Sequence, residues 1–515
     1  MSSPLILGLD AGTQSTRTAL FGADGELIDL QREILDPAVE APEADAAEQN
    51  PERYFDTLAR ATQRLAQRHP EDWKRIAGLA LSCQRATVVC VDRDGQALRP
   101  AIVWLDRRRA LHPPALPLAL RALFAAAGAG AAVRHYRHNA EVNWLAEHEP
   151  RVLERAYKVL YLSGYLHHRL SGRFVDSDAC QVGYLPFDFK YRRWAKTTDW
   201  RWRVLALRPE QLPDLVTSAT RLGNLTREAA RRFALPAGLP IVAGAADQAA
   251  ALLAAGGHCA DIPCISLGTT ATVLWPLQRY RPLERWFPLY PAAGPGGWHA
   301  EYEVFRGLWL AGWFARELAP NPGADAIAEL DREALAVAPG AAGLIALPTW
   351  SPGVPRPGAE ARGAFVGLRE SHRRAHLYRA LIEGLGFELR GGLERICHRY
   401  RLRPPRIRLA GAGAQSPLVV QCLAGITGLA VERPRVAESA ALGAAILAAT
   451  GLGLYPDVAA SARAMSRYRP AVVPEPTVHA HYERLYREVY RGLYATLAPR
   501  FARLATLAAE APPKR

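Results

Sequence analysis

The sequence predicts an α/β protein of about two domains, and three observations support this. The chain has 515 residues, which is too many for one hydrophobic core. Its first hundred residues show three consecutive strand patterns, a helix pattern and further strand patterns, an order typical of a mixed α/β domain. A short motif near the N-terminus, in which a strand, a Gly-Thr turn and a returning strand follow one another, occurs again at residues 262–275.

The first of these motifs covers residues 5–21. An apolar run from Leu5 ends at Asp10, and the chain returns through Arg17. The turn consists of Gly12, Thr13, Gln14 and Ser15. Glycine lets backbone amides approach an anion, the hydroxyls and Arg17 add donors, and the Asp10 carboxylate can hold a hydrated magnesium ion. The motif predicts a phosphate-binding hairpin, although a Gly-Thr-x-Ser turn also occurs in ordinary hairpins.

The next elements follow from turn and capping signals. Asp24-Gly25 is a tight-turn pair that leads into a strand over residues 26–34. Asn50-Pro51-Glu52 has the pattern of an N-cap, a first helical residue and a first-turn acid, so it predicts a helix to about residue 69. Up to residue 170 the further expected elements are strands at 76–82, 87–91 and 101–104 and helices at 140–147 and 157–170.

Two polar residues follow a short apolar strand near the middle of the chain. The strand over residues 241–243 is followed by Asp247 and Gln248, and then by a small-residue helix at 249–255. That helix ends at Gly256-Gly257, where we expect the domain boundary. From local sequence alone, Asp247 also fits the N-cap of this helix.

The second half begins with the repeated motif. Strands at 262–267 and 271–275 flank the turn Gly268-Thr269-Thr270, and this copy lacks an acid equivalent to Asp10. Farther on, a strand at 406–409 precedes a flexible turn. Ser416-Pro417 then begins a helix that ends at Gly428. A strand near residue 430 and a small-residue helix at 438–449 complete this part.

Composition excludes several other functional classes. The net charge of +14 comes from arginines spread through the chain, so we interpret it as a solvated basic surface and not as a nucleic-acid site. The seven cysteines are scattered, which predicts reduced thiols and no metal site. No segment has the pattern of a signal peptide or a membrane span. We therefore expect a cytoplasmic protein that binds neither membrane nor nucleic acid.

Several segments resemble, in order and spacing, the FGGY family of carbohydrate kinases. The resemblance runs from Leu5 to about Leu454. Its segments are residues 10–17 (a DxGTxSxR-like phosphate motif), 47–51 (AEQNP), 101–107 (AIVWLDR), 363–383 (the C-terminal signature), and 411–417 with 438–445 (the adenosine-binding region). The resemblance implies two ribonuclease-H-like domains of the actin-like ATPase fold with a cleft between them. It divides the chain into an N-terminal domain at 1–256, a C-terminal nucleotide-binding domain at 257–455 and a helical extension at 456–515.

The resemblance also implies a reaction, the transfer of the γ-phosphoryl group of ATP to a hydroxyl of a small sugar or polyol, with Mg²⁺. Asp247 is similar to the family's catalytic base, which accepts the proton of the attacking hydroxyl. Asp10, through water, and Asp247 would hold the metal. The ATP-binding residues implied are Gly12, Thr13, Gln14, Ser15, Arg17, Gly268, Thr269, Thr270, Gly411, Ala412, Gly413 and Gln415.

The acceptor side departs from the glycerol kinase pattern. Arg85 is kept, but Ala86 stands where glycerol kinases have a glutamate, and Glu141 stands where the family's first signature has a lysine. The substrate-binding residues implied are Gln84, Arg85, Trp104, Tyr136, Asp247 and Gln248. Because the loss of a charged partner changes which hydroxyls can be paired, we expect a xylulose-like ketose before glycerol or another polyol.

Two readings of other classes stay open beside the kinase. One is a catalytically inactive regulatory protein that binds sugar and ATP, which the departures at Ala86 and Glu141 would fit. The other is a chaperone-like or filament-forming ATPase, which would not need a base at Asp247. From the family resemblance we also expect a homodimer.

Overall fold

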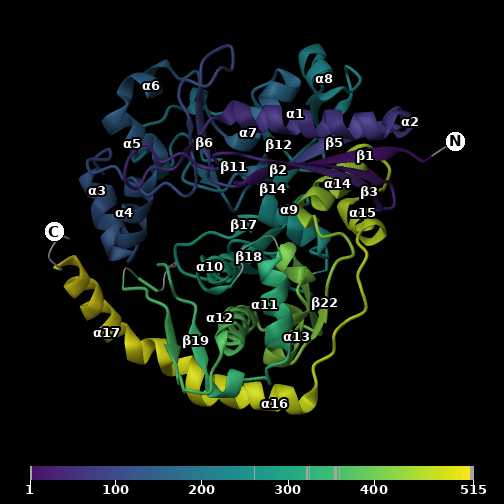
Figure 1. Ribbon diagram of the computed structural model, residues 1–515. Coiled ribbons are helices and arrows are strands. Elements are labelled where there is room, and N and C mark those ends of the chain that lie inside the picture. Colours follow the sequence, from purple (N-terminus) through teal and green to yellow (C-terminus); the bar gives the residue numbers. More distant parts are fainter. Residues whose placement is uncertain are drawn as a thin grey trace. The chain divides into compact units, whose positions relative to one another are not determined.

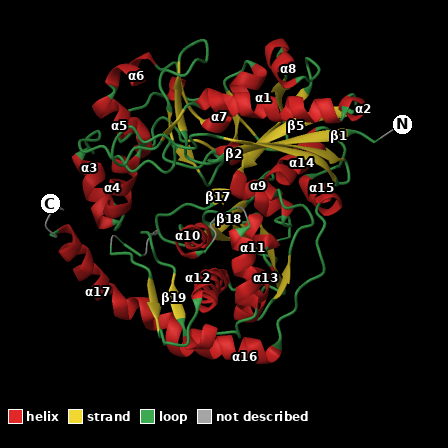
Figure 2. Cartoon of the chain, in the orientation of Figure 1, coloured by secondary structure: helices red, strands yellow, loops and turns green. Residues whose placement is uncertain are grey.

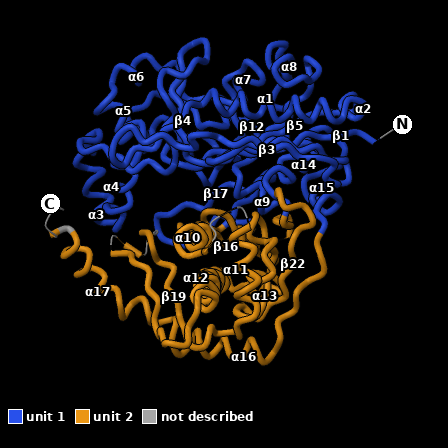
Figure 3. Tube along the Cα trace, in the orientation of Figure 1, with its two compact units in different colours: residues 1–254, 277–299, 439–467 blue, residues 255–276, 300–438, 468–515 orange. Residues whose placement is uncertain are grey.

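The computed structural model of the chain describes residues 3–259, 261–320, 323, 325–352, 357–358 and 360–510. They fold into two units, shown in Figure 3. Unit 1 contains residues 1–254, 277–299 and 439–467, and unit 2 contains residues 255–276, 300–438 and 468–515. The unit 1 segment 277–299 therefore comes from the expected C-terminal domain, and the segment 439–467 comes partly from that domain and partly from the expected helical extension. The domain boundaries at 256 and 455 stay predictions.

A six-stranded sheet with the order β13-β14-β5-β1-β2-β3 forms the centre of unit 1 (Figure 1). Its strands are β1 (Leu5–Ala11), β2 (Ser15–Gly22), β3 (Leu27–Ile34), β5 (Ile76–Cys83), β13 (Arg221–Asn224) and β14 (Pro240–Ala246). β1 to β3 are an antiparallel meander, while β1, β5 and β14 are parallel neighbours. The structure thus confirms the three consecutive strands and places their first strand at the centre of the sheet.

Helices cover both faces of this sheet (Figures 1 and 2). α1 (Pro51–Arg68) packs on β2 and β3, and Asn50 caps it by accepting a hydrogen bond from the amide of Glu52. α14 (Ser439–Gly451) packs on β1, β5 and β14, and against α9 (Asp247–Ala254). A methyl group on Gly443 would lie 2.0 Å from the carbonyl oxygen of Ala250, so these two helices approach backbone to backbone.

A second, four-stranded sheet in unit 1 has the order β4-β7-β6-β8. Its strands are β4 (Glu48–Gln49), β6 (Val88–Val91), β7 (Ala101–Ile102) and β8 (Lys158–Tyr161). The helix expected at 157–170 is therefore wrong in its first part, because β8 pairs antiparallel with β6 and the helix α7 (Leu162–Ser171) begins only afterwards. Val159 and Leu160 are fully buried in this pairing, and tertiary packing outweighs the local helical pattern.

The remaining elements of unit 1 surround this second sheet or lie at the edges of the first. The helices are α2 (Pro70–Trp73), α3 (Leu118–Ala126), α4 (Gly130–Asn139), α5 (Glu141–His148), α6 (Pro150–Arg155), α8 (Arg227–Phe233) and α15 (Val458–Met465). The short strands are β9 (Val175–Ser177), β10 (Phe187–Asp188), β11 (Arg193–Trp194) and β12 (Asp214–Val216). The helix expected at 140–147 is confirmed as α5, within one residue at either end.

A second six-stranded sheet, most of which lies in unit 2, repeats the arrangement around β1; its strand at residues 290–291 belongs to the segment 277–299 of unit 1. Its order is β17-β18-β16-β15-β21-β22, with β17 (Tyr290–Pro291), β18 (Trp298–Val304), β16 (Ala271–Leu277), β15 (Cys264–Leu267), β21 (Arg406–Ala410) and β22 (Ala430–Glu432). β15 is antiparallel to β16 and parallel to β21, just as β1 is antiparallel to β2 and parallel to β5. The two Gly-Thr hairpins therefore occupy equivalent places in two sheets of similar topology.

Helices and a small hairpin complete unit 2. They are α10 (Trp309–Leu318), α11 (Ala326–Leu335), α12 (Arg374–Tyr400), α13 (Pro417–Thr427), α16 (Pro476–Arg484), α17 (Arg491–Ala509), β19 (Ile345–Leu347) and β20 (Ala364–Val366). α13 begins at the predicted Ser416 cap, whose Oγ accepts a hydrogen bond from the amide of Val419. The seven cysteines are free thiols. In the described part of the chain no helix is long and apolar enough to cross a membrane.

Candidate active site

The hairpin of β1 and β2 brings an acidic side chain, Asp10, into direct contact with a positively charged one, Arg17. Asp10, on β1, lies opposite Arg17, on β2, in the strand register. A guanidinium nitrogen of Arg17 donates to Oδ2 of Asp10 over 3.1 Å, and Asp10 is 6% exposed. The turn between the strands is closed by the amide of Gly12, which donates to the carbonyl of Ser15. Two residues predicted to bind metal and phosphate are therefore held together.

The register of three parallel strands aligns the other predicted residues of unit 1. Asp10 on β1 and Ala245 on β14 both pair with Ser82 on β5. Asp247 follows the end of β14, and Gln84 follows the end of β5, so both lie at the same edge of the sheet as Asp10. Parallel strands meet a ligand at their carboxyl ends in open α/β sheets. Asp247, Asp10 and Gln84, which were predicted as the base, a metal ligand and a substrate-binding residue, thus lie at one edge of the unit 1 sheet.

Carboxylates near the thiol of Cys83, the last residue of β5, affect the pKa of that thiol. Burial raises the pKa of this thiol well above its usual value, and nearby charges, which include Asp247 and Asp10, raise it further. Asp247 is the first residue of α9, two residues before the expected helix start, and its Oδ1 accepts a hydrogen bond from the amide of Gln248 over 2.7 Å. Its carboxylate is half-buried, and so is the side chain of Gln248.

Thr13 is held by a chain of buried polar side chains. The indole N–H of Trp104 donates to Oγ1 of Thr13 over 2.9 Å, and that hydroxyl donates to Oε1 of Gln84 over 2.5 Å. Nε2 of Gln84 donates to the hydroxyl of Tyr54 over 2.8 Å and to Oε1 of Gln49 over 3.3 Å. Nε2 of Gln49 in turn donates to the backbone carbonyl of Thr13 over 2.8 Å. Gln84, which was predicted to bind the sugar or polyol, and Thr13, which was predicted to bind phosphate, therefore belong to one hydrogen-bond network.

Gln49 and Tyr54 were not among the predicted site residues. Gln49 lies in the AEQNP segment, which indicated a helix start and not a polar contact with the hairpin. Gln49 is 4% exposed and Tyr54 is 0% exposed, and burial raises the pKa of the Tyr54 hydroxyl far above its usual value. The sequence carries no local signal for the role of Gln49, because β4 consists only of Glu48 and Gln49, two polar residues that tertiary packing buries.

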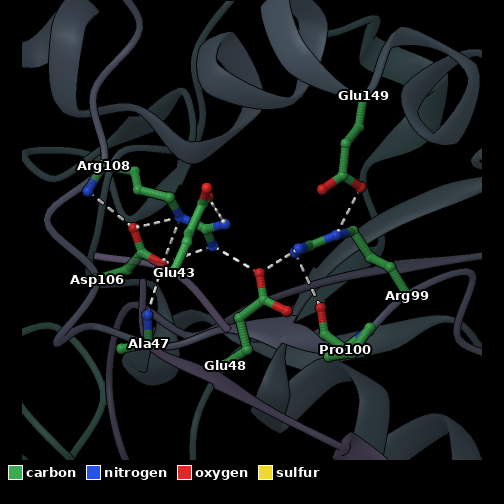
Figure 4. Close-up of polar contacts among 8 residues, drawn as sticks. All are labelled: Glu43, Ala47, Glu48, Arg99, Pro100, Asp106, Arg108 and Glu149. Carbon is green, nitrogen blue, oxygen red and sulfur yellow. Dashed lines mark hydrogen bonds and ion pairs between the residues drawn. The ribbon is translucent and has the colours of Figure 1, made fainter. Parts of the chain in front are cut away.

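An ionic network beside this chain fixes the segments that carry Gln49 and Trp104 (Figure 4). Arg108 forms ion pairs with Asp106 over 2.6 Å and with Glu48 over 2.7 Å. Arg99 reaches the same Glu48 carboxylate over 2.5 Å. Asp106 also accepts a hydrogen bond from the backbone amide of Ala47 over 2.9 Å. Since these side chains are at most 9% exposed, the network ties β4 to the loop after β7 in a desolvated setting.

The other residues predicted to bind the sugar or polyol, Arg85 and Tyr136, lie in different surroundings. The guanidinium of Arg85 lies over the ring of Tyr290, 5.3 Å from its centre. Tyr136 stacks edge-on against Tyr184 and Trp200, and its hydroxyl donates to the carbonyl of Leu185 over 3.3 Å. The structure therefore joins Thr13, Trp104 and Gln84 directly, while Tyr136 belongs to an aromatic cluster in the second sheet's core.

The two departures from the glycerol kinase pattern have distinct environments. Ala86 adopts a positive φ of 49°, and its amide donates to the carbonyl of Val182 over 3.0 Å. Glu141 is the first residue of α5. Burial, with a smaller contribution from the charge of Asp106, raises the pKa of the Glu141 carboxyl to about 8. Neither residue supplies the charge that the resembling motifs have at these positions.

In unit 2 the predicted nucleotide residues lie at two adjacent turns. Ser266, near the end of β15, pairs with Ala410, the last residue of β21, so the Gly268 turn and the Gly411 turn lie beside one another. Gly411 has a φ of 80°, and a methyl group on it would lie 2.7 Å from the carbonyl oxygen of Leu267. Ala412–Gln415 form a short 3-10 helix where a flexible turn was expected. Nε2 of Gln415 has no hydrogen-bond partner among the described residues.

Comparisons with known proteins agree with this arrangement. Family models described as the N-terminal and C-terminal domains of the FGGY family of carbohydrate kinases match residues 5–254 and 264–452. The xylulose kinase of Lactococcus lactis is 27% identical over 95% of this chain and 96% of its own length. The glycerol kinase of Rhodospirillum rubrum is 30% identical over 88% of this chain and 91% of its own. A crystal structure of ligand-bound xylulose kinase from Lactobacillus acidophilus aligns with a TM-score of 0.82 at 22% identity, over 97% of this chain and all of that chain.

Proposed function

Because the chain belongs to the FGGY family of carbohydrate kinases, it is an ATP-dependent sugar or polyol kinase with the actin-like ATPase fold, and we propose that its acceptor is a xylulose-like ketose. We propose Asp247 as the base that accepts the proton of the attacking hydroxyl. The position of Asp10, Gln84 and Asp247 at one edge of the unit 1 sheet supports this proposal most directly, since the residues proposed for metal, acceptor and proton transfer then lie in one unit.

Each residue of this edge has a chemical task in the proposal. The Asp247 carboxylate accepts the hydroxyl proton as the acceptor oxygen attacks phosphorus. The backbone amides of the hairpin and the Arg17 guanidinium bind phosphate oxygens and stabilise the charge that develops there. Arg17 also orients the Asp10 carboxylate through their ion pair. In unit 2 the Gly268 and Gly411 turns would contact the nucleotide, and Nε2 of Gln415, which has no hydrogen-bond partner among the described residues, would add a side-chain donor.

The residues present fit a magnesium ion held mostly through water. Among the residues with described positions, no group of three or more His, Cys, Asp or Glu side chains could form a metal cage. Mg²⁺ usually keeps several waters and binds through one or two carboxylates and substrate phosphates. We propose that Asp10 and Asp247 are these carboxylates. The bound ion would neutralise charge on the phosphates.

The acceptor segment favours a ketose over glycerol. Glycerol kinases are expected to hold polyol hydroxyls with an adjacent Arg and Glu, and here Ala86 supplies no side-chain acceptor. Arg85 keeps one donor group at the edge. The similarity to the Lactococcus xylulose kinase supports a five-carbon ketose. The 30% identity to a glycerol kinase keeps a polyol acceptor as the second candidate.

An ADP-release screen tests this proposal. The panel should contain pentuloses, hexuloses, tetritols, pentitols and glycerol, each with ATP and Mg²⁺. We expect one ketose to stimulate ADP release, and Asp247→Ala to abolish the stimulation while ATP binding persists. Asp214→Ala, an exposed aspartate in the same unit, is the matched control and should retain the activity. ATP binding without stimulation by any acceptor would support the inactive regulatory protein.

We also propose that the protein is a cytoplasmic homodimer. The seven free thiols fit a reducing compartment. Sedimentation equilibrium of the full chain at micromolar concentration would give twice the monomer mass, and a monomer mass would refute the dimer.

A further inference from the structure

Three arginines gather in a pocket of unit 2 that has no role in the proposed kinase reaction. The pocket has a volume of about 590 Å³ and is lined by Arg433, Arg435, Arg469 and Pro470. It is built from two segments, the residues just after β22 and the residues from 468 onward. Arg435 and Arg469 are exposed at its rim, while Arg433 is half-buried.

Backbone pairing fixes two of these arginines opposite one another. The amide of Arg469 donates to the carbonyl of Arg433 over 2.9 Å. Val431 and Val472 exchange two further backbone hydrogen bonds of 2.9 Å, so the segments run antiparallel. Like charges directly opposite each other in such a pair are destabilising. The arrangement therefore costs stability unless an anion lies between the two guanidinium groups.

No carboxylate of the described chain neutralises these arginines. The nearest acid along β22, Glu432, is already paired with Arg406 over 2.5 Å and with Arg408 over 2.8 Å. Alternate residues of a strand point to opposite faces, so Glu432 and Arg433 point apart. Nε of Arg433 is buried and has no hydrogen-bond partner within the part of the chain that is described. By contrast, the buried Arg99, Arg108 and Arg379 are all ion-paired.

We propose that this pocket binds a small phosphorylated molecule with at least two negative charges. Guanidinium groups bind phosphate oxygens through paired N–H donors, and three of them can hold two phosphate or carboxylate groups at once. The pocket volume lies within the range of small-molecule sites, which is about 300–1,000 Å³. A nucleic acid would instead need a longer row of phosphate contacts.

The lining residues of the pocket all belong to unit 2 and lie near the ends of two of its chain segments. Arg433 and Arg435 are among the last residues of the unit 2 segment that ends at residue 438, and Arg469 is the second residue of the segment that begins at 468. A ligand that binds all three arginines would hold these two connecting segments together. The inference does not rest on the proposed kinase function, since no residue of the proposed site lines this pocket.

Isothermal titration of the full chain with inorganic pyrophosphate at low salt tests the site, and inorganic phosphate forms a second arm. Whether or not the proposed phosphate hairpin also binds pyrophosphate, we expect a component that the double substitution Arg433→Met with Arg469→Met weakens by about tenfold or more. Phosphate should bind more weakly than pyrophosphate at this component. Arg17→Met, which alters the hairpin of unit 1, should leave the component in place. Arg500→Met with Arg503→Met, two exposed arginines of α17, is the matched control and should also retain it.

Several results would overturn the proposal. Pyrophosphate binding that is equal in the wild type and the Arg433/Arg469 double variant would place the ligand elsewhere, and so would an equal loss in the α17 control. Binding of duplex DNA that depends on both arginines, without a pyrophosphate component, would assign the surface to nucleic acid. If the methionine variant fails to fold, Arg433→Lys with Arg469→Lys keeps the charge but removes the paired donors, and we expect it to bind several-fold more weakly.

Discussion

The side-chain hydroxyl of Thr13 donates to Oε1 of Gln84 over 2.5 Å, and this bond joins the turn after β1 to the residue after β5. The same hydroxyl accepts the indole N–H of Trp104. Gln84 is 5% exposed, and both ends of its carboxamide have protein partners. These contacts tie the hairpin of β1 and β2 to the residues after β5 and β7, so a substitution that breaks them should lower stability and, if the hairpin binds phosphate as proposed, phosphoryl transfer.

Gln84→Ala should lower the free energy of unfolding by about 1–3 kcal/mol, because the Thr13 hydroxyl loses its acceptor and the Tyr54 hydroxyl keeps only its hydrogen bond to Gln49. Urea denaturation followed by circular dichroism measures this. Gln96→Ala, at an exposed glutamine, should change the stability by less than about 0.5 kcal/mol. Equal effects of the two substitutions would show that the buried network contributes no stability.

Trp104→Phe should reduce kcat/KM by roughly tenfold while the protein stays folded, since an aromatic ring is kept but the N–H donor to Thr13 and part of the indole volume are lost. Steady-state kinetics with the best acceptor of the ADP-release screen measures the change. Trp194→Phe is the control, because its indole N–H donates to the carbonyl of Pro213, away from the hairpin. A larger loss in Trp194→Phe than in Trp104→Phe would contradict the role of the Thr13 contact.

Arg108→Met should destabilise unit 1 by about 3–5 kcal/mol, because it leaves the carboxylates of Asp106 and Glu48 buried with fewer cationic partners. The thermal midpoint of unfolding reports this loss. Arg208→Met removes an exposed pair with Glu210 and should cost about 0–1 kcal/mol. If both variants melt together with the wild type, the network in Figure 4 does not stabilise the fold.

Glu141 should make stability depend on pH. Burial raises the pKa of its carboxyl to about 8 in the folded chain, while the unfolded value is near 4.5. Between these values the folded state keeps a proton that the unfolded state has lost, so stability falls as pH rises from about 4.5 to about 8. Glu141→Gln removes this dependence and should raise stability at pH 8 by at most a few kcal/mol, since one pKa unit corresponds to about 1.4 kcal/mol.

Urea denaturation of Glu141→Gln and the wild type at pH 5 and pH 8 measures this difference. Glu154→Gln, at an exposed glutamate, is the control and should follow the wild type at both values. A stability gain at pH 5 as large as that at pH 8 would show that titration of Glu141 is not the cause.

Gly443→Ala should destabilise the packing of α14 on α9 by about 1–3 kcal/mol or more, because the new methyl group would lie 2.0 Å from the backbone oxygen of Ala250. Gly492→Ala, in α17, meets no atom within 4 Å and should instead stabilise its helix by about 0.5–1 kcal/mol. Chemical denaturation of both variants compares the two effects. The opposite order would mean that α14 can move away from α9 without loss.

The sequence allowed most of the central sheets to be predicted, because their strands carry strong local signals. Turn and capping residues such as Asn50 and Ser416 marked helix starts that the structure confirms. The segment 157–170 was predicted as one helix, since its first residues carry no local signal for pairing with β6. The roles of the predicted site residues stay predictions, although the strand register brings Asp10, Gln84 and Asp247 to one edge.

The sequence by itself determined the two Gly-Thr hairpins, the family and the order of the motifs, because these depend on residues near one another in the chain. Only the tertiary structure decided that Gln49 and Tyr54 hold the hairpin, and that Arg433 and Arg469 face each other. Those contacts join residues that are between 30 and 71 positions apart or that follow a long excursion of the chain into unit 1. Strand register and helix packing set such contacts, and no local pattern encodes them.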